Sequence, residues 1–452
     1  MSAKANHLII CFYLDKQTEP FAQLGLKRQK RDGKWSETNQ SVSIYDKKIS
    51  GKHQISFKIS SSDENDTENS FSVVLRSVTF AKSTVPVMYF DIDEQQGSID
   101  GMNYSPEHDS ECYGKVKIEI PDGYQCEYAN DKGQTDNLKT ATYDLEYIRG
   151  RGNSTWGTDK KPYKLKLQKK ADLFNMGKNK HWVLLADYYD PTHMRNKMTY
   201  WLGQELGMEY TPQCVYVDVV MNGEYYGSYL LCEQVRIDKS RVDIDNLEDT
   251  PDATEEPTVT GGYLLSMCPQ TLQEGKTFST DRENEFQIES PEFEEEINEA
   301  QCDYIHNYVN DTEKAIYSPD FTDENGKSYK EYLDVASAIK YYWIQEFSGN
   351  GDGFISTSSY LYKKRDIENE KGKLFFGPLW DFDYVAWGNN DFDFYQCSDW
   401  VHRNSFWFDQ LFKDDSFAEE VIQEWPELKN ALNKICEDGG LLLLKDEIYC
   451  CT

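Results

Sequence analysis

The pattern of apolar residues changes near residue 290, and this change constrains the fold more than any other feature of the chain. Before it, short runs rich in Val, Ile, Tyr and Phe are separated by turn residues, which is typical of β-strands. After it, apolar residues recur at helical spacing over 291–317, 329–348 and 416–437. The sequence therefore predicts an α+β protein with a β-rich first half and a mostly helical second half.

The clearest pair of strands is a hairpin at 214–232. Its two β-rich runs flank Asn222-Gly223, and Asn-Gly in this position is the strongest short hairpin signal. One helix is expected inside the β-rich half, because Asp190-Pro191 is a helix start signal ahead of an apolar stripe. The other strands expected in this half lie at 114–120, 142–148, 160–167 and 181–186.

These patterns divide the chain into three parts. Residues 1–83 form a β-rich, sandwich-like module, residues 84–235 the β-rich half with its helix, and residues 236–452 the mostly helical half with a β-hairpin near 360–380. The acidic, Pro- and Thr-rich segment 245–260 is expected to be a mobile loop. The strands expected in the first module lie at 7–14, 41–47, 53–60 and 70–80.

The charge of the chain argues against two classes of partner. Lys and Arg number 48 and Asp and Glu 79, so the formal net charge is −31. So acidic a surface repels phosphate backbones and anionic membranes, which disfavours nucleic-acid binding and favours metal ions or a Lys/Arg-rich protein. The apolar run at 7–14 is too short to span a bilayer, so no membrane insertion is expected. The 11 cysteines include no Cys-x-x-Cys pair, and buried free thiols are the simplest interpretation.

A basic, Gly-rich turn lies between two expected strands and is a candidate anion site. Its residues Arg151, Gly152, Asn153 and Ser154 offer a permissive backbone and several hydrogen-bond donors, although an ordinary hairpin turn is the alternative. A phosphate-binding enzyme also needs a fixed cation on the strand that follows such a loop. Two lysines on that strand are the candidates, Lys161 by proximity and Lys164 on the opposite face.

Three further candidates follow along the β-rich half. Arg195 and Asn196 lie in the first turn of the expected helix, where an Arg can reach a phosphate or form a surface salt bridge. Glu233 ends the second hairpin strand, at the junction between the two halves. In a two-lobed kinase the backbone at this junction pairs with adenine, and a simple strand end is the alternative.

The helical half contains three candidate acids. Asp352 lies on a Gly-flanked loop after a long helix, where a carboxylate can accept a hydroxyl proton or hold a metal, or only form a turn. Asp381 and Asp383 follow an apolar strand, two residues apart. Such a pair suits Mg²⁺, which takes one or two carboxylates together with substrate phosphates.

Residues from about 85 to about 440 resemble the spore-coat CotH kinase family. The matching segments, in family order, are VPVMYFDID, RGRGNSTWGTDKKPYKLKL, HWVLLADYYDPTHMRNKM, VDVVMNGEYYGSYLLCEQV, GGYLL, NGDGFISTSSYLYKK and FGPLWDFDYVAWG. The RGRGNSTW and WDFD segments are the most specific of these. The resemblance implies a two-lobed, atypical protein-kinase-like fold, with residues 1–83 as an additional β module.

The resemblance also implies roles for the candidate residues. Arg151 to Ser154 would form the phosphate loop with Lys161 behind it, and Asp352 would be the catalytic-loop acid. Asp381, with Asp383 close behind, would hold the metal. Arg195, Asn196 and Glu233 match the family's Arg-Asn pair and its post-hairpin glutamate. The chain departs from ordinary protein kinases because it has Thr357 where a second metal ligand is expected, and Asp-Phe-Asp in place of Asp-Phe-Gly.

Three functions are compatible with these residues. The first is a Mg²⁺-dependent ATP:protein phosphotransferase that acts on Ser or Thr of a basic, Ser-rich protein. Its cofactors would be ATP and Mg²⁺. The second is a non-catalytic, kinase-like surface, adhesion or scaffolding protein. The third, a protein that binds or hydrolyses carbohydrate, depends on the abundant aromatics and paired acids. The resemblance implies an extracellular, cell-surface or spore-associated location.

Overall fold

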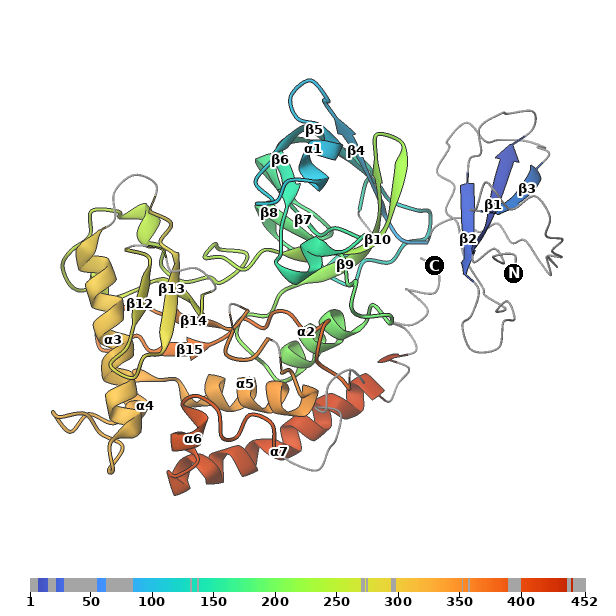
Figure 1. The fold of residues 1–452 in the computed structure, drawn as a ribbon. Helices are drawn as coiled ribbons and strands as arrows, with labels where there is room; N and C mark the ends of the chain where they lie inside the picture. Colours follow the sequence, from blue (N-terminus) through green and yellow to red (C-terminus); the bar gives the residue numbers. More distant parts are fainter. Residues whose placement is uncertain are drawn as a thin grey trace, which may run out of the picture.

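The computed structural model describes residues 7–14, 22–27, 55–61, 84–130, 132–135, 138–269, 273, 275–293, 298–351, 353–356, 358–388, 400–436 and 440–441. Within these residues the chain is α+β, as the sequence predicts (Figure 1). The main elements are a closed barrel, a second sheet and a group of helices beneath them.

The barrel is built from seven strands in the order β10-β8-β7-β6-β5-β4-β9, and β9 pairs with β10 to close it. Strands β4 and β9 are parallel, and the other neighbours are antiparallel. Closure leaves no unpaired edge, and the sequence did not predict it. The strands are β4 (Val87–Ile92), β5 (Cys112–Glu119), β6 (Ala141–Gly150), β7 (Tyr163–Asp172), β8 (Lys178–Leu185), β9 (Cys214–Met221) and β10 (Glu224–Glu233).

The predicted hairpin is confirmed as β9 and β10. Its turn residues Asn222 and Gly223 have φ of 46° and 88°, the left-handed conformation that an Asn-Gly turn supplies. The Asn222 side chain also accepts a hydrogen bond from the Ile92 backbone N–H at 2.7 Å. The turn therefore fixes the end of β4 as well as joining its own two strands.

The predicted helix of the β-rich half is α2 (Arg195–Glu205), which lies below the barrel and packs against α5 and α7 (Figure 1). Asp190 organises its start, because its carboxylate accepts from the backbone N–H groups of Thr192 and Arg195, both at 2.9 Å. A short helix, α1 (Ile99–Asn103), precedes it in the chain and was not predicted.

The second half of the chain is less purely helical than the sequence predicts. The expected hairpin near 360–380 exists as β14 (Tyr360–Lys363) and β15 (Leu374–Phe376), but it is part of a five-stranded sheet, β12-β13-β11-β14-β15. The sequence prediction missed β11 (Tyr263–Met267), β12 (Thr277–Ser279) and β13 (Glu285–Ser290). These strands are short, and their periodicity does not stand out locally.

The helices differ from the predicted ranges at their ends. Helix α3 (Glu299–Tyr317) begins later than residue 291, because the side chain of Asn298 caps it by accepting from Gln301 N. The single helix expected at 329–348 is two, α4 (Tyr329–Tyr332) and α5 (Val335–Ser348), because Asp334 caps the second. The remaining helices are α6 (Phe408–Leu411) and α7 (Asp415–Cys436).

The segment 245–260, predicted as a loop, contains two short 3-10 helices, η2 (Leu247–Asp249) and η3 (Thr258–Thr260). Near the N-terminus, β1 (His7–Leu14), β2 (Ala22–Lys27) and β3 (Ile55–Ser61) form an antiparallel sheet in the order β2-β1-β3. The sequence predicted β1 and β3 but not β2, and the strands expected at 41–47 and 70–80 lie outside the described residues. In the part of the chain that the structure describes, no helix is long and apolar enough to cross a membrane.

Candidate functional site

The predicted phosphate loop follows β6 and runs into a 3-10 turn, η1 (Ser154–Gly157). Gly152 has a φ of 85°, which favours glycine at this position. Trp156 anchors the loop, because its buried indole donates to Ser105 O at 2.9 Å. Its ring also lies so close to Gly150 that a Cβ there would be 2.2 Å from it. The loop is therefore attached to the barrel by packing.

The two predicted lysines have different surroundings. Lys161 Nζ donates to Trp156 O at 2.6 Å and lies 5.0 Å from the centroid of that ring, so this lysine braces the loop. Lys164 lies on β7 and is paired across the strand with Arg149 on β6. Burial, with Arg149, Arg236 and Arg151 as nearby positive charges, lowers the pKa of Lys164 to about 8.

Lys164 therefore lies within a concentration of positive charge, which we call the basic cluster. Its other members are Arg149, Arg151 and Arg236, which lower the pKa of Lys164. The negative charge of Glu292 acts in the opposite direction and raises that pKa. Such an arrangement costs free energy unless an anion neutralises it. These nearby positive charges therefore favour Lys164 over Lys161 as the lysine of an anion site.

Lys160, a half-buried lysine of the same segment, has no place in the predicted site. Its ammonium donates to Ala186 O at 2.8 Å and to Ser228 O at 2.5 Å. Burial lowers the pKa of Lys160 to about 8, and the negative charges of Asp187 and Asp218 oppose this shift. Lys160 thus lies between Asp218 on β9 and Asp187, the carboxylate that contacts α2.

The predicted pair on α2 contacts the Trp380-Asp381-Phe382-Asp383 segment. Arg195 donates through its guanidinium to Asp383 O at 3.1 Å. The buried Asn196 side chain accepts from Phe382 N at 2.8 Å and donates to Asp187 Oδ1 at 2.9 Å. Both residues therefore position the acidic segment.

Three carboxylates gather at this point, and we call Asp187, Asp381 and Asp383 the acidic cluster. Burial raises the pKa of Asp187 to about 7, although Asn196 and Lys160 act in the opposite direction. Burial also raises the pKa of Asp383, and the charges of Asp381 and Asp187 and a hydrogen bond with Asp381 add to this rise. At least one proton or cation is needed to hold these groups together.

Asp381 is held in a constrained conformation. Its φ is 68°, and its Oδ2 accepts from Ser358 Oγ at 2.7 Å. Its backbone carbonyl accepts from Asn350 Nδ2 at 3.2 Å, and Asn350 Oδ1 in turn accepts from Gly353 N at 3.0 Å. The fully buried Asn350 thereby joins the Gly-rich loop after α5 to the acidic segment. Asp352, the predicted catalytic acid, lies outside the described residues.

The basic and acidic clusters meet at aromatic contacts. The Arg151 guanidinium lies 5.5 Å from the centroid of the Trp380 ring. Trp380 is the residue directly before Asp381 in the chain. Burial raises the pKa of Tyr360, Arg151 opposes this rise, and Asp381 adds to it, so both charges are close to this hydroxyl. The structure thus brings Arg151, Lys164, Arg195, Asn196, Asp381 and Asp383 into one region between the barrel and the second sheet.

Glu233 is placed differently from the other predicted residues. Its carboxylate is buried and pairs with Arg241, whose guanidinium nitrogen lies 2.6 Å from Glu233 Oε1. Its other oxygen accepts from Gln213 N at 3.0 Å. Burial raises the pKa of Glu233 to about 7, while Arg241 lowers it. These contacts hold the end of β10.

A family model described as CotH kinase protein matches residues 148–434. The chain belongs to the CotH kinase family. This match confirms the resemblance seen in the sequence, and it covers every predicted site residue. Membership indicates a kinase-like protein. A search of curated proteins gives no match.

Sequence reasoning missed several residues that the CotH domain brings into this region. They are Arg149, Lys160, Asp187, Arg236, Asn350 and Ser358. Asp187 carries a local signal, since it stands in the family-like segment HWVLLADYYDP. The others are common residue types whose surroundings depend on strands and loops far apart in the chain.

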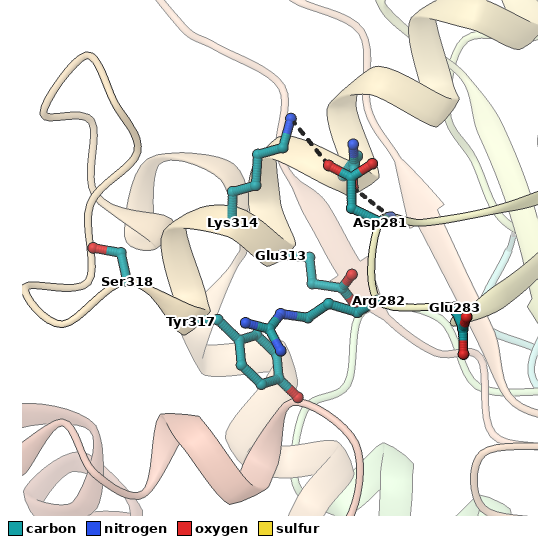
Figure 2. Close-up of a pocket in the computed structure, with 8 residues that line it drawn as sticks. Asp281, Arg282, Glu283, Glu313, Lys314, Tyr317 and Ser318 are labelled. Atoms are coloured by element: carbon teal, nitrogen blue, oxygen red, sulfur yellow. Dashed lines mark hydrogen bonds and ion pairs between the residues drawn. The ribbon is translucent and has the colours of Figure 1, made fainter.

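The CotH domain also contains an open cavity of about 640 Å³ outside this region. Figure 2 shows its lining at the β12–β13 turn and α3, with the Arg282 guanidinium stacked 3.6 Å from the centroid of the Tyr317 ring. None of the predicted site residues lines it. Buried Glu313 accepts there from Asn284 and from Trp407, at 2.6 Å and 2.8 Å, so part of this lining is structural.

Proposed function

We propose that the protein is a Mg²⁺-dependent ATP:protein phosphotransferase with an atypical, two-lobed kinase-like fold. The observation that carries the proposal is the meeting of the basic and acidic clusters at Arg151 and Trp380. Phosphoryl transfer depends mainly on positioning and charge neutralisation, so a phosphate site beside a carboxylate site supplies its main requirements.

The basic cluster is the proposed triphosphate site. Arg149, Arg151 and Arg236 all act on Lys164, and a bound triphosphate would relieve this repulsion. The loop from Arg151 to Ser154 adds backbone groups at a turn that Gly152 permits. Glu233 is not needed for this site, because its carboxylate already pairs with Arg241.

Asp381 and Asp383 are the residues that would hold Mg²⁺. They fit the ion because both supply hard oxygen ligands and because their carboxyls are within hydrogen-bond reach of each other. When bound, the ion would neutralise negative charge on the phosphates. Asp187 lies near this pair, but no three His, Cys, Asp or Glu side chains of the described residues could hold a metal together, so phosphate oxygens would complete the site.

The acceptor is a serine or threonine hydroxyl of a basic, Ser-rich protein. A bond forms between its oxygen and the γ-phosphorus, the bond from that phosphorus to the β–γ bridging oxygen breaks, and ADP leaves. The hydroxyl proton passes to Asp352, the proposed acceptor-side acid. The net charge of −31 would attract a cationic acceptor over long range.

The test uses two lysines of the same strand. Lys164→Met should abolish the rise in melting temperature that Mg-ATP causes and should abolish transfer of radiolabel to a basic protein. Lys166→Met is the matched control, since Lys166 forms an ion pair with Glu146 at 2.7 Å, and it should retain both. No stabilisation of the wild type at millimolar Mg-ATP would refute the proposed function.

A non-catalytic, kinase-like scaffold is the second candidate. It is favoured by Thr357, which stands where an ordinary protein kinase has a second metal ligand. The same measurements separate the two functions, because a scaffold would transfer no radiolabel even where Mg-ATP stabilises it.

A further inference from the structure

The β9–β10 hairpin brings two cysteines face to face. Cys214 begins β9, and Cys232 is its direct partner on β10. Both side chains are buried, with exposures of 1% and 0%, and the Cys232 thiol is within hydrogen-bond reach of the Cys214 thiol. The two residues lie far from the turn, at the open end of the hairpin.

The hydrogen-bond pattern shows which kind of cross-strand pair they form. The bond beside them runs from Glu233 N to Gln213 O, at 3.1 Å, one residue beyond the pair. The backbone N–H and C=O of Cys214 instead both bond to the Tyr128 hydroxyl, at 3.0 Å and 3.1 Å. Cys214 and Cys232 are therefore a non-hydrogen-bonded pair of an antiparallel ladder.

This geometry is compatible with a covalent link. In a non-hydrogen-bonded pair the Cα atoms are about 4.5 Å apart. Disulfides span Cα separations of about 4.4–6.8 Å. The backbone already holds the two residues at a distance that a disulfide accepts, so no strand has to move.

We propose that Cys214 and Cys232 are a redox site that a low-molecular-weight disulfide oxidises to a cross-strand disulfide. One thiolate attacks the reagent and forms a mixed disulfide, releasing one reagent thiol. The second thiolate then attacks the protein sulfur of that mixed disulfide and releases the other reagent thiol. The protein loses two protons and two electrons, and the reagent is reduced to two thiols.

The oxidation takes place during folding. In the folded chain both cysteines lie in one core cluster with Val183 of β8 and with Tyr200 and Leu202 of α2. These side chains cover the thiols, whereas the hairpin itself is a local structure that can form earlier. The disulfide would then close a loop of about 20 residues and constrain the unfolded chain.

The location links the redox site to the barrel and to α2. Burial raises the pKa of Tyr200, and Cys232, Cys214, Asp381 and Asp187 all add to the rise. The cysteine pair and the acidic cluster therefore both lie close to one buried tyrosine. The inference does not depend on the proposed function, because its test measures covalent state and stability.

The experiment refolds the full chain with either oxidised or reduced glutathione, alkylates the remaining thiols and maps the peptides by mass spectrometry. We expect one linked peptide pair, joining Cys214 to Cys232, after oxidative refolding only. The oxidised protein should melt about 5–10 °C higher than the reduced protein.

Cys112 and Cys126 provide the matched control. Both are buried in the barrel, but their thiols donate to Ser98 O and Phe174 O. Cys112→Ala should keep the linked peptide and the shift in melting temperature, whereas Cys232→Ala should lose both. Alkylated Cys214 and Cys232 in correctly folded, oxidatively refolded protein would overturn the proposal, as would linkage of either to a different cysteine.

Discussion

Asn196 offers the sharpest test of how the acidic segment is held. Its side chain makes two buried hydrogen bonds, one to Asp187 and one from Phe382 N. Asn196→Leu fills a similar volume but leaves the Asp187 carboxylate and the Phe382 N–H without this hydrogen-bond partner. A buried polar group left unsatisfied costs about 1–3 kcal/mol, so the loss should be about 2–6 kcal/mol of unfolding free energy.

Asn196→Asp tests the same contact through the pH dependence of stability. Its carboxylate can still accept from Phe382 N, but its second oxygen would face the Asp187 carboxylate. Two carboxylates in contact share one proton, so the pKa of the pair rises further above its value in the unfolded chain. Relative to the wild type, this variant should therefore lose stability as pH rises from about 4 through 7.

The assay is urea unfolding of both variants and the wild type from pH 4 to pH 8 without Mg²⁺, followed by tryptophan fluorescence. Asn196→Asp should be close to the wild type at pH 4 and well below it at pH 8. Asn196→Leu should be destabilised across the whole range. Equal stability of Asn196→Asp and the wild type at pH 8 would refute the bridge between α2, Asp187 and Phe382.

Four other outcomes follow from the same structure. Glu233→Gln should lower stability by about 3–5 kcal/mol in urea unfolding, because it removes the ion-pair partner of buried Arg241, and should leave the affinity for Mg-ATP unchanged in calorimetry. Because burial raises the pKa of Asp187 to about 7, ionisation of Asp187 costs stability as pH rises from 4 to 7, so Asp187→Asn should gain stability relative to the wild type over this range in the same assay. Asp381→Asn should weaken Mg-ATP binding and abolish radiolabel transfer together. If Asp383→Asn has both effects and Asp381→Asn has neither, Asp383 is the metal ligand in place of Asp381. Transfer to a basic acceptor should slow between 0.05 and 0.5 M salt, about the range in which screening becomes strong, while ATP affinity measured by calorimetry changes less.

Some of the architecture is readable from the sequence because local chemistry decides it. Asn222-Gly223 is compatible with few turns other than a tight hairpin, and both residues adopt left-handed φ angles. Asp190-Pro191 precedes a helix, and the Asp190 carboxylate accepts from the N–H of Arg195, the first residue of α2, although the helix begins four residues after Pro191. The RGRGNSTW and WDFD segments identified the family, and the match over 148–434 confirms it.

Closure of the barrel is a different matter, because it depends on β4 pairing with β9 across more than a hundred residues. No periodicity within either strand encodes that partner. The same holds for the second sheet, where β11 pairs with β13 on one side and β14 on the other. The strands are short, and their pairing comes from tertiary packing.

The roles of individual charges were also decided by tertiary structure. The sequence prediction preferred Lys161 by its proximity to the loop, kept Lys164 as the second candidate and gave Lys160 no role. Folding places half-buried Lys160 near Asp187, binds Lys161 to the Trp156 carbonyl and places Lys164 near three arginines. A side chain's charge is fixed by its residue type, but its pKa and its partners are set by the burial and the neighbours that the fold brings to it.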